Sequence, residues 1–546
     1  MISTDRAAHS LVAAAALALA TAGCSPSPAA PDALATATPI KHLVVIFDEN
    51  VSFDHYFATY PAAQNPPGEP TFTAAASTPA VNGLSGALLF HNPNDIAARN
   101  GDLASNPFRL DRSQAATASQ SHLYTAEQMA YHGGAGDLFP YYTGQAMPGG
   151  SGSFNTPSVV MGYYDGNTVT ALWNYAQRFA MNDNAYSDQY GPSTPGAINL
   201  VSGQTNGVVV VKRSDSTWYA HDGQGGFTLI NDVQPAHDSC SLPYDVATFT
   251  GKNIGDLLNA RAVAWGWFQG GFDLGVKNPD GSTGCTRSTR SVVAGVASSD
   301  YLPHHEPFQF YPSTANPRHR RPASIAAIGV SGDSANHQYD LHDFVDAVQA
   351  GHFPAVSFLK AAAFEDGHSG YSDPLDEQRF VVELLNYLQQ QADWKNTAVI
   401  ILYDDSDGWY DHQFAPVANA SFADADRLDG LHRCGTKGTT PQLGGVTGRG
   451  PVDGRCGPGT RQPFLVISPW ARTNFVDHTR VTQASVIRFI EDNWLNGVRI
   501  GGGSFDATAG DIRGMFDFTG PTRVPALFID DSLGTPTSQP SGRLPH

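Results

Sequence analysis

The chain has 546 residues, of which 41% are hydrophobic, enough for one large α/β core or two ordinary domains. This composition excludes a chain that is disordered along most of its length. Its 32 basic residues stand against 51 acidic ones, a formal charge of -19, which argues against a nucleic-acid partner and against adhesion to an anionic membrane surface.

The first residues predict export. Arg6 precedes an apolar run over residues 11–20, which is too short to span a bilayer, and small residues then lead to Cys24. The sequence Thr21-Ala22-Gly23-Cys24 is similar to a bacterial lipobox, which would make Cys24 a lipidated membrane tether; simple cleavage near Cys24 is the alternative. We therefore interpret residues 1–38 as a signal peptide and a Pro/Ala/Ser tether, and expect a periplasmic, outer-membrane-anchored or secreted protein.

An even number of cysteines follows Cys24, which is typical of disulfides in an exported chain. Their order along the chain favours pairs between sequence neighbours, each closing a Gly-rich loop, with free buried thiols as the alternative. None has the close paired spacing of a zinc site. The expected pairs are Cys240 with Cys285 and Cys434 with Cys456.

Two apolar segments that end in acidic residues are the centre of the prediction. Residues 40–47 predict a buried strand that runs into Asp48-Glu49-Asn50, and residues 397–403 predict another that runs into Asp404-Asp405. In an open parallel sheet the carboxyl ends of the strands face the ligand crevice, so these oxygens could bind a metal there. The alternative is that they are ordinary turn residues.

Other segments alternate between strand and helix patterns, which predicts an α/β fold with a mostly parallel sheet and loop insertions. A buried strand at 355–360, a helix at 377–390 and a strand at 397–403 follow one another along the chain. Together they predict a strand, helix, strand unit. The other expected strands are 263–268 and 463–468, and the other expected helices are 52–57, 172–179, 481–494 and segments opening near 121 and 337.

Gly191-Pro192-Ser193-Thr194-Pro195 predicts the start of a further helix, because proline suits a first turn and a hydroxyl is a good cap. Ser193 or Thr194 would lie at the amino end. Free N–H groups and the helix dipole there favour an anion, and a plain helix cap is the alternative.

Several histidines lie on loops next to these elements. His304 and His305 share a proline-bounded loop where both can face one cavity, and His368 follows the strand at 355–360. Composition alone makes His122, which precedes Asp137 near a helix start, an ordinary exposed residue.

Taken together, these motifs resemble the bacterial phosphoesterase family, which includes respiratory-burst-inhibiting acid phosphatases and bacterial phospholipases C. The resemblance runs from about Ile40 to Asp530. The motifs that carry it are residues 49–57, Gly191-Pro192-Ser193, His304-His305-Glu306-Pro307-Phe308, and residues 371–374 through Asp404-Asp405-Ser406-Asp407-Gly408-Trp409-Tyr410-Asp411-His412.

The resemblance implies an α/β/α sandwich similar to alkaline phosphatase and the sulfatases, with one divalent metal ion in a crevice at the strand ends. Ser193 would be the nucleophile and a metal ligand. The other implied metal ligands are Glu49, Asn50, Asp404 and Asp405. The residues expected to line the phosphate pocket are His304, His305 and His368, with His122 and Asp137 as further candidates.

The resemblance predicts an exported acid phosphatase that hydrolyses small phosphate monoesters through a phosphoserine. Val51 stands where the phospholipase branch commonly has Arg, and the chain ends without that branch's added carboxyl-terminal domains. The alternatives are a phospholipase C and a non-catalytic metal- or solute-binding lipoprotein. We expect residues 39–533 to form the catalytic domain and 534–546 a flexible tail, with activity highest below neutral pH because of the histidines. The metal's identity and the oligomeric state do not follow from the sequence.

Overall fold

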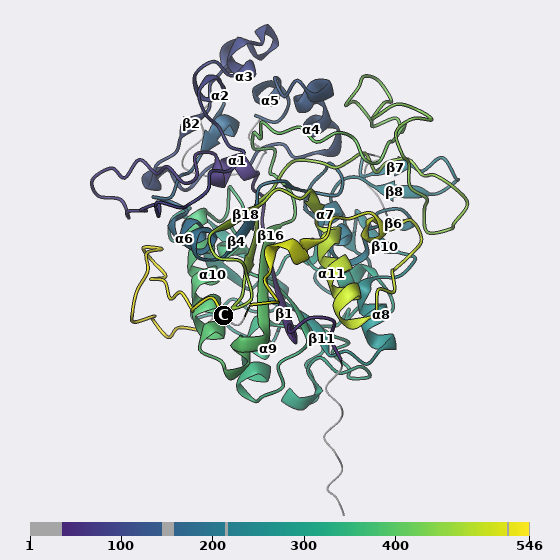
Figure 1. The fold of residues 1–546 in the computed structure, drawn as a ribbon. Helices are drawn as coiled ribbons and strands as arrows, with labels where there is room; N and C mark the ends of the chain where they lie inside the picture. Colours follow the sequence, from purple (N-terminus) through teal and green to yellow (C-terminus); the bar gives the residue numbers. More distant parts are fainter. Residues whose placement is uncertain (1–34, 145–157, 213–216, 521–522, 545–546) are drawn as a thin grey trace, which may run out of the picture. The chain divides into compact units, whose positions relative to one another are not determined.

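A computed structural model describes residues 35–144, 158–212, 217–520 and 523–544 (Figure 1). The expected signal peptide and Cys24 lie outside the described residues. The described residues from Thr36 onward form one compact unit. Among the described residues, no helix has the length and apolar character to cross a membrane.

The central sheet has eight strands in the order β14-β11-β15-β1-β16-β17-β4-β18. β1 (His42–Asp48) lies between β15 (Val356–Lys360) and β16 (Thr397–Tyr403) and is parallel to both. In this sheet β17 (Phe464–Ile467) runs antiparallel to both of its neighbours, so the predicted mostly parallel sheet is confirmed. The remaining strands are β4 (Ala180–Asn182), β11 (Trp265–Gln269), β14 (Gln338–Tyr339) and β18 (Phe475–Asp477).

The central strands form because their apolar residues are covered on both faces of the sheet. Helices α6 and α10 lie on one side of it in Figure 1, and α7, α8 and α11 lie on the other. The Tyr387 hydroxyl of α10 donates to the Val345 carbonyl of α9, which places α9 beside α10. The bounds of these helices are α6 (Thr170–Arg178), α7 (Ser193–Ser202), α8 (Ile254–Ala260), α9 (Leu341–Gln349), α10 (Pro374–Gln389) and α11 (Ala484–Trp494).

Shorter helices and strands lie within the segments that connect these elements. The helices are α1 (Phe53–Phe57), α2 (Ala87–Phe90), α3 (Pro93–Ile96), α4 (Tyr124–Tyr131) and α5 (Phe139–Tyr142). The strands are β2 (Phe108–Arg109), β3 (Gly162–Tyr163), β5 (Ala185–Tyr186), β6 (Val208–Lys212), β7 (Tyr219–His221), β8 (Phe227–Leu229), β9 (Gln234–Pro235), β10 (Val246–Phe249), β12 (Ser288–Arg290), β13 (Ala297–Ser299) and β19 (Val481–Thr482).

Several helices begin a few residues away from the expected position, and two of these differences have a clear local cause. The helix expected from 481 begins at Ala484, because the preceding β19 pairs with β5. The helix expected near 337 begins at Leu341, because the Asp340 side chain caps it by accepting the His342 N–H. In both cases a local pairing or cap takes residues that the apolar pattern alone assigns to the helix.

Both expected disulfides are confirmed. Cys240 is bonded to Cys285 and Cys434 to Cys456, with Cα separations of 5.2 and 5.9 Å. Cys434 and Cys456 are fully buried, so their loop is anchored in the molecule and not only closed on itself.

A fully buried arginine joins segments that are far apart in the sequence. Arg461 Nη2 lies 3.0 Å from Asp54 Oδ1, and its Nε lies 3.0 Å from Asp411 Oδ1. Its Nη1 donates to the backbone carbonyls of Asn82 at 2.7 Å and Asp183 at 2.9 Å. We call this set the Arg461 junction. Because each guanidinium nitrogen has an acceptor, the buried charge is compensated.

Candidate active site

The acidic residues that follow β1 and β16 meet at one edge of the sheet. Asp48 is paired in register with Tyr403, so Glu49-Asn50 and Asp404-Asp405 leave the sheet side by side. Asn50 adopts a positive φ of 35°, a conformation that asparagine tolerates better than most residues and that turns the chain sharply at the strand end. All four side chains are at most 1% exposed.

Oxygen atoms from different segments converge at this edge. The Asn50 amide oxygen lies 2.6 Å from Glu49 Oε2, 2.8 Å from Asp404 Oδ1 and 3.2 Å from Asp405 Oδ2. Ser193 Oγ lies 3.1 Å from Glu49 Oε2 and 3.1 Å from Asp405 Oδ2. The structure therefore brings together the expected nucleophile and every expected metal ligand. We call these five residues the oxygen cluster.

Helix α7 delivers Ser193 to the cluster through a close approach to β16. Ser193 is the first residue of α7, and a Cβ atom at Gly196 would lie only 2.1 Å from the Asp404 carbonyl oxygen. A side chain at position 196 would push the helix away, so glycine permits the contact. Gly196, about one helical turn after the motif Gly191-Pro192-Ser193, is thus needed for the close packing of α7 against Asp404.

The residues of the oxygen cluster fit a divalent cation. The Asn50 amide oxygen faces only hydrogen-bond acceptors, an arrangement that a cation among these oxygens or a rotated amide would relieve. Asp404 Oδ2 is buried without a hydrogen-bond partner in the described part of the chain, and carboxylate, amide and hydroxyl oxygens are ligands that hard cations prefer. Burial, together with the neighbouring Glu49 carboxylate, raises the pKa of Asp404 to about 8, which shows how strongly this place disfavours an uncompensated negative charge.

A buried lysine contacts the same carboxylates. Lys360, the last residue of β15, places its Nζ in contact with Glu49 Oε1 and 3.6 Å from Asp404 Oδ2. His305 Nδ1 lies 3.1 Å from the same Glu49 oxygen and 3.8 Å from Asp366 Oδ2. Glu49 therefore faces Ser193 with one oxygen and basic groups with the other.

The remaining expected histidines also border the cluster. His122 Nδ1 lies 2.8 Å from Asp407 Oδ1 and 3.6 Å from Asp405 Oδ1, although composition alone made it an exposed residue. His368 Nε2 lies 3.0 Å from the Asn50 side-chain amide. The rings of His304 and His305 are 4.3 Å apart, so the proline-bounded loop turns both toward the same region.

Their surroundings shift the pKa values of these histidines in different directions. Burial lowers the pKa values of His304 and His368, and it lowers that of His305 well below its usual value. Burial also disfavours the charge on His122, but Asp405 and Asp407 raise its pKa well above the usual value. Only His122 among the four therefore gains protonation from its surroundings, and the expected activity optimum below neutral pH stays a prediction.

The expected anion site at the start of α7 is already occupied by protein groups. The Thr194 N–H donates to Asp232 Oδ1 at 2.8 Å, and the Gly191 N–H donates to Glu127 Oε2 at 2.9 Å. The Thr194 hydroxyl also donates to Asp232, at 2.8 Å, so it points away from the oxygen cluster. These carboxylates fix the loop that carries Ser193, and they use N–H groups that the sequence pattern left free.

Two expected site residues do not join this group by a hydrogen bond or ion pair in the described part of the chain: His304, which has a ring contact with His305, and Asp137. The Asp137 carboxylate lies 3.0 Å from Nδ1 of His132, whose side chain is 62% exposed. The residues that sequence reasoning missed are Lys360, Asp366, Asp407, Glu127 and Asp232. Of these, Lys360 had a usable signal, because a lysine at the end of a buried strand needs a partner.

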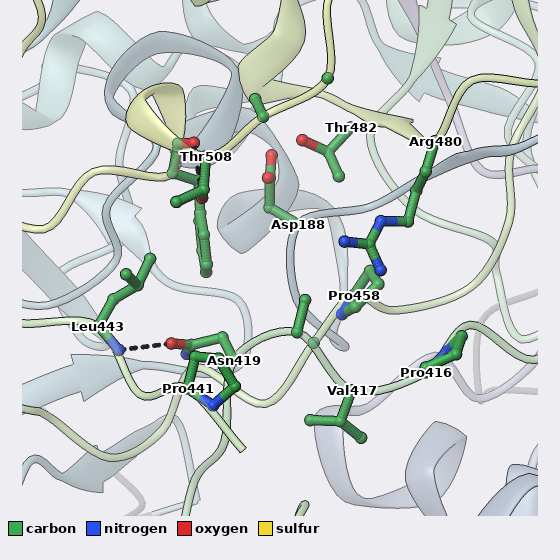
Figure 2. Close-up of a pocket in the computed structure, with 15 residues that line it drawn as sticks. Asp188, Pro416, Val417, Asn419, Pro441, Leu443, Pro458, Arg480, Thr482 and Thr508 are labelled. Carbon is green, nitrogen blue, oxygen red and sulfur yellow. Dashed lines mark hydrogen bonds between the residues drawn. The ribbon is translucent and has the colours of Figure 1, made fainter. Parts of the chain in front are cut away.

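A separate pocket of about 460 Å³, shown in Figure 2, contains none of the expected site residues. Its wall includes Asp188, whose backbone N–H donates to the Gln483 side chain, and Gln483 donates in turn to the Asp404 carbonyl. Leu443 and Asn419, joined by the hydrogen bond drawn in Figure 2, form part of the opposite wall. This pocket adjoins the backbone behind the acidic strand end and supplies no ligand to the cluster.

Comparison with known proteins identifies the class of enzyme. The sequence pattern of the phosphoesterase family matches residues 40–496. The chain belongs to this family. It is a phosphoric ester hydrolase, which leaves the non-catalytic lipoprotein alternative without support.

Curated relatives of this phosphoesterase are phospholipases C. Phospholipase C B of Mycobacterium tuberculosis is 23% identical over 495 residues, which cover 89% of this chain and 79% of that protein. Non-hemolytic phospholipase C of Pseudomonas aeruginosa is 24% identical over 508 residues, which cover 90% of this chain and 59% of that protein. These relatives do not single out the acid phosphatase branch.

A solved structure of murine ectonucleotide pyrophosphatase/phosphodiesterase 5 aligns with 64% of this chain and 95% of its own length, at 13% identity. The TM-score of 0.29 is too low for this similarity to support a conclusion about fold or function.

Proposed function

We propose that this phosphoesterase is a metal-dependent hydrolase of the phospholipase C type, which cleaves phosphodiesters with Ser193 as its nucleophile. The observation that carries the proposal is the convergence of Ser193 Oγ with buried Glu49 and Asp405 oxygens, both at 3.1 Å. The substrate class rests on the phospholipases C that are 23–24% identical over most of the chain. This choice replaces the acid phosphatase interpretation of the sequence as the leading hypothesis.

We propose that the oxygen cluster holds one divalent cation and that the histidines around it bind the phosphoryl group. When bound, the cation would offset the negative charge of the phosphoester and lower the pKa of a coordinated hydroxyl. The identity of the ion does not follow from an all-oxygen ligand set.

The protein groups divide the chemistry between them. Ser193 Oγ attacks phosphorus, the bond to the glycerol oxygen breaks, and water then hydrolyses the phosphoserine. His304 and His368, partly exposed at the rim of the cluster, can hydrogen-bond phosphoryl oxygens or protonate the departing alkoxide. His122, fixed by Asp407, can add a positive charge beside Asp405.

A monoesterase is the second candidate, favoured by one residue. Val51, which follows the proposed metal ligand Asn50 directly, is apolar and 1% exposed, so at this place the chain offers no charged group for a larger head group. By resemblance, the phospholipase branch commonly has Arg at this position. A compact pocket of this kind would suit a simple phosphate monoester.

Turnover of two chromogenic substrates decides between these candidates. We expect kcat/KM for a p-nitrophenyl phosphorylcholine diester to exceed that for p-nitrophenyl phosphate by at least about tenfold, or about 1.4 kcal/mol of transition-state stabilisation. Both activities should disappear with a chelator and return with a divalent cation. A reversed preference would assign the chain to the acid phosphatase branch, and chelator-resistant turnover would remove the metal from the proposal.

The domain boundaries and export also remain proposals. We propose that residues 39–533 form the catalytic domain of an exported protein. The first residue of the expected tail is in contact with the domain, since Asn174 Nδ2 donates to the Gly534 carbonyl at 3.0 Å.

A further inference from the structure

The two oxygens of Glu49 face two different sets of side chains. Oε2 lies 3.1 Å from Ser193 Oγ, on the side of the oxygen cluster. Oε1 contacts Lys360 Nζ and lies 3.1 Å from His305 Nδ1. Glu49 therefore bridges the oxygen cluster and a second position, with one carboxylate oxygen on each side.

The second position, around Glu49 Oε1, has side chains that could bind a metal ion. Single ligand atoms from Glu49, His305 and Asp366 all lie within 4.8 Å of one another, and the three side chains are buried. An imidazole nitrogen and two carboxylates are ligands that divalent metal ions take in proteins. A cation could therefore be bound here by residues that are already in place.

The ammonium group of Lys360 lies at this position, where a second metal ion would otherwise bind. Its side chain is 1% exposed, and its ammonium contacts Glu49 and lies 3.6 Å from Asp404 Oδ2. These two buried carboxylates compensate the ammonium charge. A second divalent ion would have to share the Glu49 oxygen with this ammonium, at a separation where like charges in a buried site repel strongly.

We propose that the Lys360 ammonium takes the place of a second metal ion, so that the active site holds one divalent cation and one built-in positive charge. The inference rests on the proposed metal site of the oxygen cluster. Lys360 acts as a positioning residue: it holds Glu49 in the bridging orientation and excludes a second ion from the Glu49, His305 and Asp366 ligand set.

The number of bound Mn²⁺ ions tests the proposal independently of activity. Mn²⁺ is counted by elemental analysis after equilibrium dialysis, and electron paramagnetic resonance reports spin coupling between ions on the order of 4 Å apart. The wild-type chain should bind one uncoupled Mn²⁺. Lys360→Gln should bind two, with a coupled spectrum, because its removal frees Glu49 Oε1 and leaves Asp366 uncompensated.

Matched variants separate the ligand set from general effects. Lys360→Gln with Asp366→Asn should return to one Mn²⁺, because the second site then loses a carboxylate. Lys395→Gln, at an exposed position, should bind one Mn²⁺ like the wild type. Thermal unfolding of each variant shows that the counts refer to folded protein.

Each outcome bears on a different claim. A wild-type chain that binds no Mn²⁺ would remove the proposed metal site, whereas one that binds two would overturn only the role of Lys360. Folded Lys360→Gln that still binds one ion at saturating Mn²⁺ would also overturn it. If Lys360→Gln does not fold, the Asp366→Asn variant decides. In the proposal Asp366 binds no metal ion in the wild-type chain, so Asp366→Asn should still bind one Mn²⁺. Loss of that ion would contradict the proposal.

Discussion

Ser193→Ala should lower turnover by at least about a thousandfold while the protein remains folded. The serine hydroxyl contacts Glu49, Asn50 and Asp405 and no structural hydrogen-bond partner outside the oxygen cluster in the described residues, so its loss removes chemistry and not the fold. The measurement is kcat on a chromogenic phosphodiester, with circular dichroism to check folding. Ser202→Ala, in the last turn of the same helix, is the matched control and should remain active.

The covalent step can be observed directly. Acid quenching during turnover should trap phosphate on the peptide that contains Ser193, and a chiral phosphoester should be hydrolysed with net retention because two displacements occur. Thr194 is the neighbouring competitor, but its hydroxyl donates to Asp232 and the Val233 carbonyl. Inversion at phosphorus would exclude a covalent serine, and near-normal turnover of Ser193→Ala would point to another nucleophile.

Asp404→Asn should weaken metal binding and activity together, each by at least about a hundredfold. Mutation of a residue that only hydrogen-bonds to a metal ligand already lowers metal affinity or activity by up to about that factor. Asp404 Oδ1 accepts the backbone N–H groups of Asn50 and Asp405, whereas Oδ2 has no hydrogen-bond partner among the described residues, so the amide replacement can keep the turn while removing the charge. Metal content and kcat/KM are measured on the same preparation.

The control for this variant is Asp424→Asn, because the Asp424 side chain is 95% exposed and its carboxylate pairs with the surface residue His432. It should keep both metal and activity. If Asp404→Asn retained its full metal content and rate, Asp404 would not be a ligand, and the cluster would have to be reassigned around Glu49 and Asp405.

Much of the central sheet could be predicted because the sequence patterns that indicate its strands are local. Buried strands read as uninterrupted apolar runs, and the acidic residues after β1 and β16 share a sheet edge as soon as the strands are parallel. The expected strand at 397–403 matches β16 over its full length. The disulfides could be predicted from neighbouring cysteines in a chain expected to be exported.

What could not be predicted depends on contacts between segments far apart in the sequence. Asp232 and Glu127 take the N–H groups beside Ser193 from loops that no local pattern connects to α7. His122 becomes buried against Asp407, and Lys360 finds its partner more than 300 residues away. Asp137 is implied only by the family resemblance, and its carboxylate instead meets the exposed His132.

The Arg461 junction has a consequence for how the loops around it open. Its guanidinium holds Asp54, Asp411 and the carbonyls of Asn82 and Asp183, so releasing any one of these segments strands a buried charge or leaves a donor unpaired. The loops beyond α1, β4 and β16 therefore cannot fray one at a time. Their amide protons should exchange with deuterated solvent together, with a common opening free energy, as a single cooperative unit of the native state.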